Sequence, residues 1–215
     1  MKRFVVSYSG GKDSVLALHR MVRAGWEPHA LLTTYHGERN RTWFHGLPVP
    51  LLERVADSLG IPLSLAICGE GENYNEIFVS ALRRFRNEGA EAVVFGDIDL
   101  QAHRDWCEAR CAEAGLEAVL PLWNEDRETL VNEFLDAGFS TVLKVVRRKE
   151  LPESFLGRTL DHPLVEEIKA CGADACGENG EYHTFVFDGP LFRERVAFQA
   201  GRVERTETHA CLELE

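Results

Sequence analysis

The sequence predicts an α/β protein built on a doubly wound, mostly parallel sheet, with a smaller α+β subdomain at its C-terminal end. Three observations point to this fold class. Short β-rich runs alternate along the chain with segments whose apolar residues recur every three or four positions. The helical segments are long enough to carry the chain across a sheet to a parallel neighbour. The chain has 215 residues, of which 45% are hydrophobic and 27% charged, so it can bury a core of this size.

Strands and helices alternate through the first 125 residues. The first strand, 4–8, stops at two glycines, and the apolar residues of 15–22 then repeat at helical spacing up to Gly25. Further strands are expected at 29–35, 61–67 and 92–95, a short apolar stretch at 118–123, and further helices at about 50–59, 75–87 and 102–114. This order predicts a doubly wound domain over residues 1–125.

The pattern changes after about residue 125. A helix at 127–137, a strand at 141–146 and a helix at 164–171 are expected there. Near the end, 196–199 and 202–204 are expected to pair as a hairpin around a turn at Ala200-Gly201. Residues 126–215 are therefore predicted to form the smaller subdomain, packed on the first domain.

Composition and charge exclude several classes of protein. The formal net charge of −11 opposes extended nucleic-acid binding, because neutralising phosphates takes clustered Lys and Arg. No apolar run approaches the roughly 20 residues that cross a bilayer, and the strand-like start shows no secretory signal, so we expect a cytoplasmic protein without membrane contact. The six cysteines are expected to be thiols, since cytosolic chains seldom carry disulfides. A homodimer is compatible with the sequence.

The strongest chemical signal follows the first strand. This segment reads Ser9-Gly10-Gly11-Lys12-Asp13-Ser14. Its glycines allow the backbone to approach a ligand closely, and the helix that begins here points free amide groups at the same place, which predicts an anion site. The serine hydroxyls and Lys12 add donors and positive charge, and Asp13 is a candidate Mg²⁺ ligand. The spacing is neither that of a P-loop NTPase nor that of a dinucleotide-binding fingerprint.

This segment and several later motifs together resemble a known family. Residues 9–14 match in full the Ser-Gly-Gly-x-Asp-Ser pattern of the PP-loop of N-type ATP pyrophosphatases. Within that superfamily the chain is most similar to the diphthine–ammonia ligase family, over about residues 3–192. The later motifs that carry this resemblance are Gly96-Asp97, Leu120-Pro121-Leu122-Trp123, Lys144-Val145-Val146, Leu156-Gly157-Arg158, Cys176-Gly177-Glu178-Asn179-Gly180-Glu181-Tyr182-His183-Thr184 and Asp188-Gly189-Pro190-Leu191-Phe192.

The resemblance implies an adenine nucleotide alpha hydrolase-like fold and an ATP-dependent, amide-forming ligase. An acceptor carboxylate would be adenylated with release of pyrophosphate, and ammonium would then aminate it with release of AMP. Catalysis is chiefly positioning and charge neutralisation in such a reaction. The implied cofactors are ATP and Mg²⁺. The implied partners are ammonium and a carboxylate acceptor, either diphthine on a translation elongation factor or a related carboxylate.

The candidate site residues fall into three groups. The expected catalytic residues are Lys12, Asp13, Glu178 and Glu181, with Asp13 as the metal ligand. ATP is expected on Ser9, Gly10, Gly11, Lys12, Asp13 and Ser14, and the backbone of Thr33, Thr34 and Tyr35 at the second strand end is expected to read the adenine. The acceptor is expected at Gly96, Asp97, Gly177, Glu178, Asn179, Glu181 and His183, with the imidazole of His183 orienting the glutamates. Arg39, Arg41, Trp43 and His45 lie in a loop that either closes over ATP or stays solvated.

One segment departs from the family pattern. Many members carry an aromatic and basic Ser-Asp-Tyr-Gln-Arg type segment after the strand that ends near Gly96, whereas this chain has Asp97-Ile98-Asp99-Leu100-Gln101-Ala102-His103-Arg104. Because this region should face the acceptor, the sequence leaves the acceptor open.

Two alternatives remain open at this point. The first is a PP-loop RNA-modifying enzyme, either a lysidine-type ligase or a thiolase that carries sulfur on Cys107, Cys111 or Cys176, although the acidic charge weighs against RNA binding. The second is a nucleotide-binding regulatory protein that holds ATP without turning it over.

Overall fold

The computed structural model describes residues 1–42 and 45–215, and their larger sheet confirms the predicted fold class. The strands of this sheet are β1 (Arg3–Ser7), β2 (Glu27–His36), β3 (Arg41–Thr42), β4 (Leu63–Cys68), β5 (Ala92–Val94) and β6 (Glu117–Val119). Strand β2 pairs with β1 and β4, and β1 pairs with β5, which pairs with β6, all in parallel. Only the short β3 is antiparallel to its neighbour among the described strands of this sheet.

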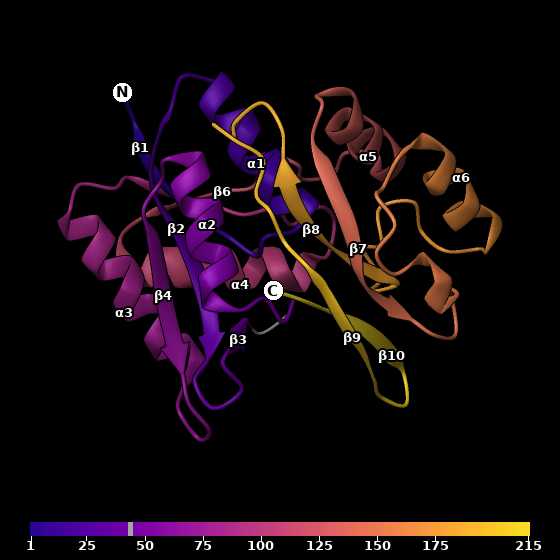
Figure 1. Cartoon of the computed structure of the whole chain (residues 1–215). Helices are drawn as coiled ribbons and strands as arrows, with labels where there is room; N and C mark the ends of the chain where they lie inside the picture. The colour runs from indigo at the N-terminus through magenta and orange to yellow at the C-terminus, as the bar shows by residue number, and fades with distance from the viewer. Residues whose placement is uncertain (43–44) are drawn as a thin grey trace.

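Helices cover both faces of the parallel sheet (Figure 1). They are α1 (Lys12–Arg23), α2 (Val49–Leu59), α3 (Tyr74–Asn87) and α4 (Gln101–Ala114). Side chains along β1 alternate between the two faces: Phe4 and Val6 pack in one core cluster with α1 and α2, whereas Val5 packs in the other with α3 and α4. The sheet is therefore buried on both sides, as a doubly wound fold requires.

A second, antiparallel sheet follows in the C-terminal part. Its strands are β7 (Ser140–Arg147), β8 (Tyr182–Asp188), β9 (Ala200–Arg205) and β10 (His209–Leu214), in the order β8-β7-β10-β9. Helices α5 (Arg127–Asp136) and α6 (His162–Ala170) and a single 3-10 turn (Glu153–Phe155) accompany it. This arrangement matches the α+β subdomain expected from the sequence.

The predicted hairpin near the C-terminus is wrong in its position. Ala200 and Gly201 lie within β9, where Ala200 pairs with Leu214 of β10, and the chain reverses after Arg205. The turn forms there because the Thr206 amide donates to the His209 carbonyl at 2.9 Å, and the Thr206 hydroxyl accepts from the His209 amide at 3.0 Å.

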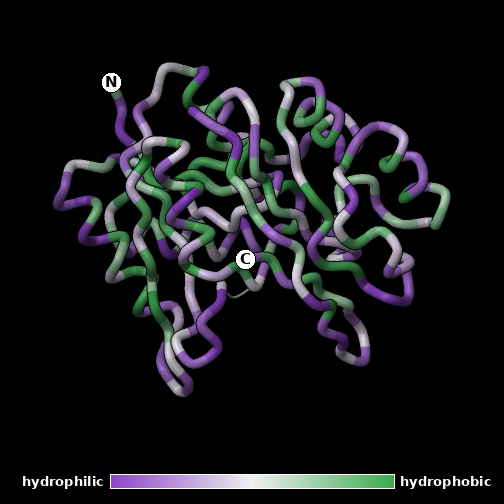
Figure 2. The backbone as a smooth tube through the Cα atoms, in the orientation of Figure 1, coloured by the Kyte–Doolittle hydropathy of each residue, from purple (hydrophilic) through white to green (hydrophobic). Residues whose placement is uncertain are grey.

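The two sheets share one hydrophobic core. One cluster of buried residues includes Val15 and Leu16 of α1 together with Phe185 and Phe187 of β8. The backbone amide of Val186 donates to the Gly10 carbonyl at 2.9 Å, which attaches β8 directly to the loop after β1. Hydrophobic residues run along the central strands in Figure 2. In the described part of the chain, every helix is too short or too polar to cross a membrane.

Candidate active site

A cavity of about 490 Å³ lies at the carboxyl ends of β1 and β5, where the first sheet meets β8. Its lining comes from the loop after β1, the segment after β5, helices α3 and α4, and residues 176–184. Of the site residues predicted from the sequence, it is lined by Ser9, Lys12, Asp13, Ser14, Gly96, Asp97, Gly177, Glu178 and His183. The strand ends of an open α/β sheet are the usual place for a ligand.

The loop after β1 is shaped by close packing at its glycines. Gly10 has φ +84°, and a Cβ there would collide with the side chain of Leu47. A Cβ on Gly96 would lie 2.7 Å from the carbonyl carbon of Asp13 and 2.8 Å from the amide nitrogen of Ser14. These contacts bring β5 and the start of α1 together. Gly11, the N-cap residue of α1, offers no side chain, and the Lys12 amide donates to the Thr184 hydroxyl at 3.0 Å, so the helix N-terminus can attract an anion in the cavity through its dipole and the other amides of its first turn.

Lys12 and Asp13 form an ion pair at the inner wall of the cavity. The Lys12 Nζ lies 2.9 Å from each carboxylate oxygen of Asp13 and donates a further hydrogen bond to the Cys176 carbonyl. Burial of Lys12, which is 4% exposed, opposes its charge, but the combined attraction of Asp13, Cys176, Tyr182 and Glu178 outweighs this, so the pKa of Lys12 lies well above its usual value. The ammonium therefore stays charged at neutral pH.

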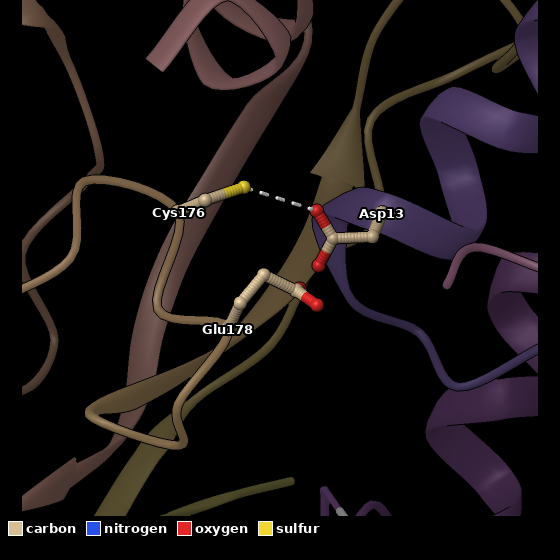
Figure 3. A group of neighbouring side chains, drawn as sticks. All are labelled: Asp13, Cys176 and Glu178. Atoms are coloured by element: carbon tan, nitrogen blue, oxygen red, sulfur yellow. Dashed lines mark hydrogen bonds between the residues drawn. The ribbon is translucent and has the colours of Figure 1, made fainter. Parts of the chain in front are cut away.

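Asp13, Cys176 and Glu178 point toward one another from α1 and from the segment before β8 (Figure 3). Each offers one ligand atom, and these atoms lie within 4.8 Å of one another. Burial and the nearby charge of Asp13 raise the pKa of Glu178 to about 8. The two carboxylates fit a hard cation such as Mg²⁺, which prefers oxygen ligands. Burial raises the pKa of the Cys176 thiol, which donates to Asp13 Oδ1 at 3.6 Å, so this sulfur is not an activated nucleophile.

The structure does not bring Glu181 or Asn179 into the cavity. The Glu181 carboxylate is buried beneath the loop and accepts from the amides of Asp174, at 3.2 Å, and Asn179, at 3.0 Å, and from the Asn179 side chain at 3.0 Å. The adjacent glycines, Gly177 and Gly180, have φ of 73° and 84°. Glu181 thus holds the shape of the loop that presents Glu178.

The residues predicted to read adenine do not line this cavity. Thr33 and Thr34 line a small adjoining cavity of about 60 Å³, which shares Ser7, Ser9, His45 and Tyr74 with the larger one, and the Thr33 hydroxyl donates to the Tyr8 carbonyl at 2.8 Å. Tyr35 lines neither cavity and pairs with Thr42 of β3. Gly10 and Gly11 shape the loop without lining the cavity.

Among its described residues, the segment between β2 and α2 contributes His45 to the cavity. His45 lines it and bonds to the Thr184 carbonyl at 2.9 Å through Nδ1. Burial lowers the pKa of His45 to about 4 and that of His183 to about 3, so both imidazoles are neutral at pH 7. Arg41 instead pairs with Glu213 at 2.6 Å, and Trp43 lies outside the described residues.

Sequence reasoning missed the aromatic wall of the cavity. Tyr74 and Trp106 line it from α3 and α4, with ring centroids 6.0 Å apart, and the Trp106 indole donates to Asn75 Oδ1 at 2.8 Å. The Asp97 carboxylate and His103 Nδ1 lie 3.0 Å apart and share a hydrogen bond. Their positions in the sequence could have indicated this role, because these side chains belong to helices that follow the carboxyl ends of β4 and β5.

Two family models match the chain on either side of residues 119–125. The model described as the diphthamide synthase N-terminal domain matches residues 1–118, and the model of the C-terminal domain matches residues 126–215. The chain belongs to the diphthamide synthase family. This confirms the resemblance found in the sequence and makes the chain a member of a family of ATP-dependent ligases.

Curated relatives of this diphthamide synthase family member carry the name diphthine–ammonia ligase. The relative from Homo sapiens is 25% identical, over 94% of this chain and 84% of its own length. The relative from Danio rerio is 28% identical, over 92% of this chain and 87% of its own length. Among solved structures, a predicted subunit of a tRNA methyltransferase from Methanocaldococcus jannaschii aligns with a TM-score of 0.47 at 16% identity, over 90% of this chain and 100% of that one.

Proposed function

We propose that the protein adenylates an acceptor carboxylate with ATP and aminates it with ammonium, releasing AMP and pyrophosphate. The observation that carries this proposal is a cavity that joins the N-terminus of α1 and Lys12 to the carboxylates of Asp13 and Glu178. One end of this cavity suits phosphates, and the other suits a cationic nitrogen donor. The relatives named diphthine–ammonia ligase use, by that name, the same nitrogen donor.

The phosphate end holds the leaving group. The amides at the start of α1 and the hydroxyls of Ser9 and Ser14, which lie 3.1 Å apart, can bind the β and γ phosphates as one unit. Lys12 supplies positive charge there, although it also neutralises Asp13. Asp13 and Glu178 are the residues that would hold Mg²⁺, and the ion would neutralise charge on the phosphates when bound.

The acceptor end carries the amination. An acceptor carboxylate oxygen attacks the α phosphorus, the bond to the bridging oxygen breaks, and pyrophosphate leaves. Ammonia then attacks the acyl carbon of the acyl-adenylate, and AMP leaves with the bonding electron pair. Ammonium must lose a proton before it can attack, and Glu178, whose pKa is raised to about 8, accepts that proton in its ionised form, which predominates above pH 8.

We further propose that the acceptor is diphthine on a translation elongation factor and that the reaction takes place in the cytoplasm. The thiolase alternative gains no support from the site. Burial raises the pKa of the thiols of Cys107, Cys111 and Cys176, and a sulfur carrier needs an accessible thiolate. The formal net charge of −11 also opposes docking on RNA.

The position at which ATP is cut tests the proposal. Phosphorus NMR of a mixture of protein, ATP, Mg²⁺, ammonium and a diphthine-bearing elongation factor should show AMP and pyrophosphate in equal amounts. ADP with phosphate would overturn the adenylation mechanism, and ATP binding without any turnover would favour the regulatory alternative. An Asp57→Asn variant, changed at a carboxylate on α2 outside the cavity, should retain full turnover.

A further inference from the structure

Arg127 joins two segments that flank the cavity. It is the first residue of α5, and its Nε and Nη2 donate to the two carboxylate oxygens of Asp99 at 2.7 Å each. Its Nη1 donates to Asp174 and lies 3.3 Å from Asn179 Oδ1. Asp99 belongs to the segment after β5, and Asp174 precedes residues 176–184. One guanidinium therefore connects the two segments.

Asp174 in turn holds the backbone that presents Glu178. Its Oδ1 accepts from the amide of Cys176 at 2.9 Å, and its Oδ2 accepts from the amide of Glu178 at 3.2 Å. Asp99, Arg127 and Asp174 are absent from the described lining of the cavity, so they act on its contents only through other residues. The path from Asp99 to Glu178 is a continuous chain of charge-assisted hydrogen bonds.

Asp99 lies in the segment that follows β5, and Arg127 binds its carboxylate in bidentate fashion. The planar fork of Arg127 places separate nitrogens on Asp99 and on Asp174, whereas Lys offers a single nitrogen atom, from which this geometry cannot be reproduced.

We propose that Asp99, Arg127 and Asp174 form a clamp that sets the position of Glu178 relative to the segment after β5, and that these three are positioning residues for the amination step. This inference rests on the proposed function for its chemistry, though not for its geometry. Misplacing a reacting group by about 1 Å can cost roughly a hundredfold in rate. The clamp should therefore affect kcat of amide formation and leave the KM for ATP, which binds at the start of α1, unchanged.

The test separates transmission through the clamp from loss of stability. Asp99→Asn removes one end of the clamp, and hydrogen exchange followed by NMR then reports on the amides of Cys176 and Glu178 at the other end. We expect roughly tenfold faster exchange there, because the weakened Arg127 holds Asp174 less firmly. Unchanged exchange at both amides would overturn the proposal.

A matched control comes from a second arginine with three partners. Arg20 bonds to Glu125 at 2.5 Å, to the Pro121 carbonyl at 2.7 Å and to Glu133 at 2.9 Å, away from the cavity. Arg20→Gln should lower the melting temperature without changing exchange at Cys176 and Glu178. If it accelerates exchange there as much as Asp99→Asn does, the effect is general loosening and the clamp is refuted.

Kinetics with a diphthine-bearing elongation factor complete the test. Arg127→Gln should lower kcat for amide formation roughly ten- to a hundredfold with the KM for ATP unchanged, and Arg127→Lys should fail to restore it. Wild-type kcat in Arg127→Lys, or a higher KM for ATP with kcat retained in Arg127→Gln, would overturn the positioning role. If the wild-type protein shows no amide formation, the proposed function fails, and the exchange measurements still decide whether the clamp exists.

Discussion

Glu178 is a carboxylate whose burial makes the folded protein less stable as the pH rises. Its pKa is raised from 4.5 to about 8 in the folded protein, chiefly by burial and then by Asp13, whereas the unfolded chain keeps the ordinary value. Between these two pKa values the folded state binds a proton that the unfolded state does not, so folding stability falls as pH rises from about 4.5 to about 8. This loss of stability is the cost of burying a carboxylate with a nearly neutral pKa in the cavity.

Glu178→Gln should remove that cost. We expect the variant to match the wild type in unfolding free energy near pH 4 and to exceed it at pH 9 by a few kcal/mol, because one pKa unit corresponds to about 1.4 kcal/mol. Its amide formation should be lost, while its affinity for ATP in the absence of Mg²⁺ stays within a fewfold. Urea unfolding at the two pH values measures the first effect and calorimetry the last. Equal stability at pH 9 would contradict the assignment of Glu178 as a buried, protonated acid.

Glu181→Gln is the matched comparison, since the same substitution is made three residues away. Hydrogen bonds from the side chain and amide of Asn179 and from the amide of Asp174 overcome its burial and lower its pKa. The variant should lose about 1–3 kcal/mol at neutral pH, because charge-assisted hydrogen bonds are weakened. Thermal melts at pH 7 would show this as a lower melting temperature. A Glu181→Gln protein as stable as Glu178→Gln at pH 9 would refute the different roles of the two carboxylates.

The sequence grouped these two glutamates because they share one glycine-spaced motif. It could not separate their roles, since the direction of each side chain depends on the left-handed conformations of Gly177 and Gly180 and on Asp174, which lies outside the motif. By contrast, Lys12 and Asp13 could be placed correctly beside the cavity. Their positions depend only on a strand, a glycine turn and a helix that follow one another directly.

At the scale of secondary-structure elements, the closest approach in the site is between the end of β5 and the start of α1. Gly96→Ala would place a methyl group 2.7 Å from the Asp13 backbone, which has no flexible group that could move aside. We expect the Kd for Mg-ATP to rise at least tenfold and the unfolding free energy to fall by about 1–3 kcal/mol. Calorimetry and chemical denaturation measure both.

Gly37→Ala is the control for this prediction. Its Cβ would meet only the Ile67 side chain at 3.5 Å, an ordinary van der Waals contact, and its φ lies outside the left-handed region. This variant should bind Mg-ATP as the wild type does. Equal ATP affinity in Gly96→Ala and Gly37→Ala would show that the contact between β5 and α1 does not shape the nucleotide site.

Most of the element boundaries could be predicted because they depend on local signals. The helix expected at 75–87 is α3, Tyr74–Asn87, whose first turn is capped by Asn73 through bonds to the amides of Asn75 and Glu76. The C-terminal hairpin was misplaced because its turn depends on pairing with a strand, β10, that the sequence did not separate from its surroundings. Strand β3 has two residues, which is too short to leave any periodic pattern.

At the scale of the whole molecule, the boundary seen in the sequence near residue 125 does not divide the core. The side chain of His19 on α1 packs edge-on against Phe139, with ring centroids 5.2 Å apart, and the amide of Lys12 donates to the Thr184 hydroxyl at 3.0 Å. The amide of Arg193 donates to the Ser58 carbonyl at the end of α2 at 2.9 Å. The loop after β1 is therefore completed by residues from the C-terminal part.

A fragment of residues 1–125 should consequently fail to form the nucleotide site. Without β8, the Gly10 carbonyl loses the Val186 amide, and the apolar faces of α1 and α2 lose Phe185 and Phe187. Burying an aromatic side chain contributes roughly 1.5–3 kcal/mol, so the fragment loses a large share of the 5–15 kcal/mol by which domains are typically stable. We expect no cooperative thermal transition by circular dichroism and no binding of Mg-ATP by calorimetry, whereas the full chain should unfold in a single transition.

Adding residues 126–215 as a separate chain should restore both the cooperative transition and the binding of Mg-ATP. A fragment that melts cooperatively and binds Mg-ATP on its own would show that the first sheet and its helices are sufficient for the nucleotide site and that the shared core is dispensable.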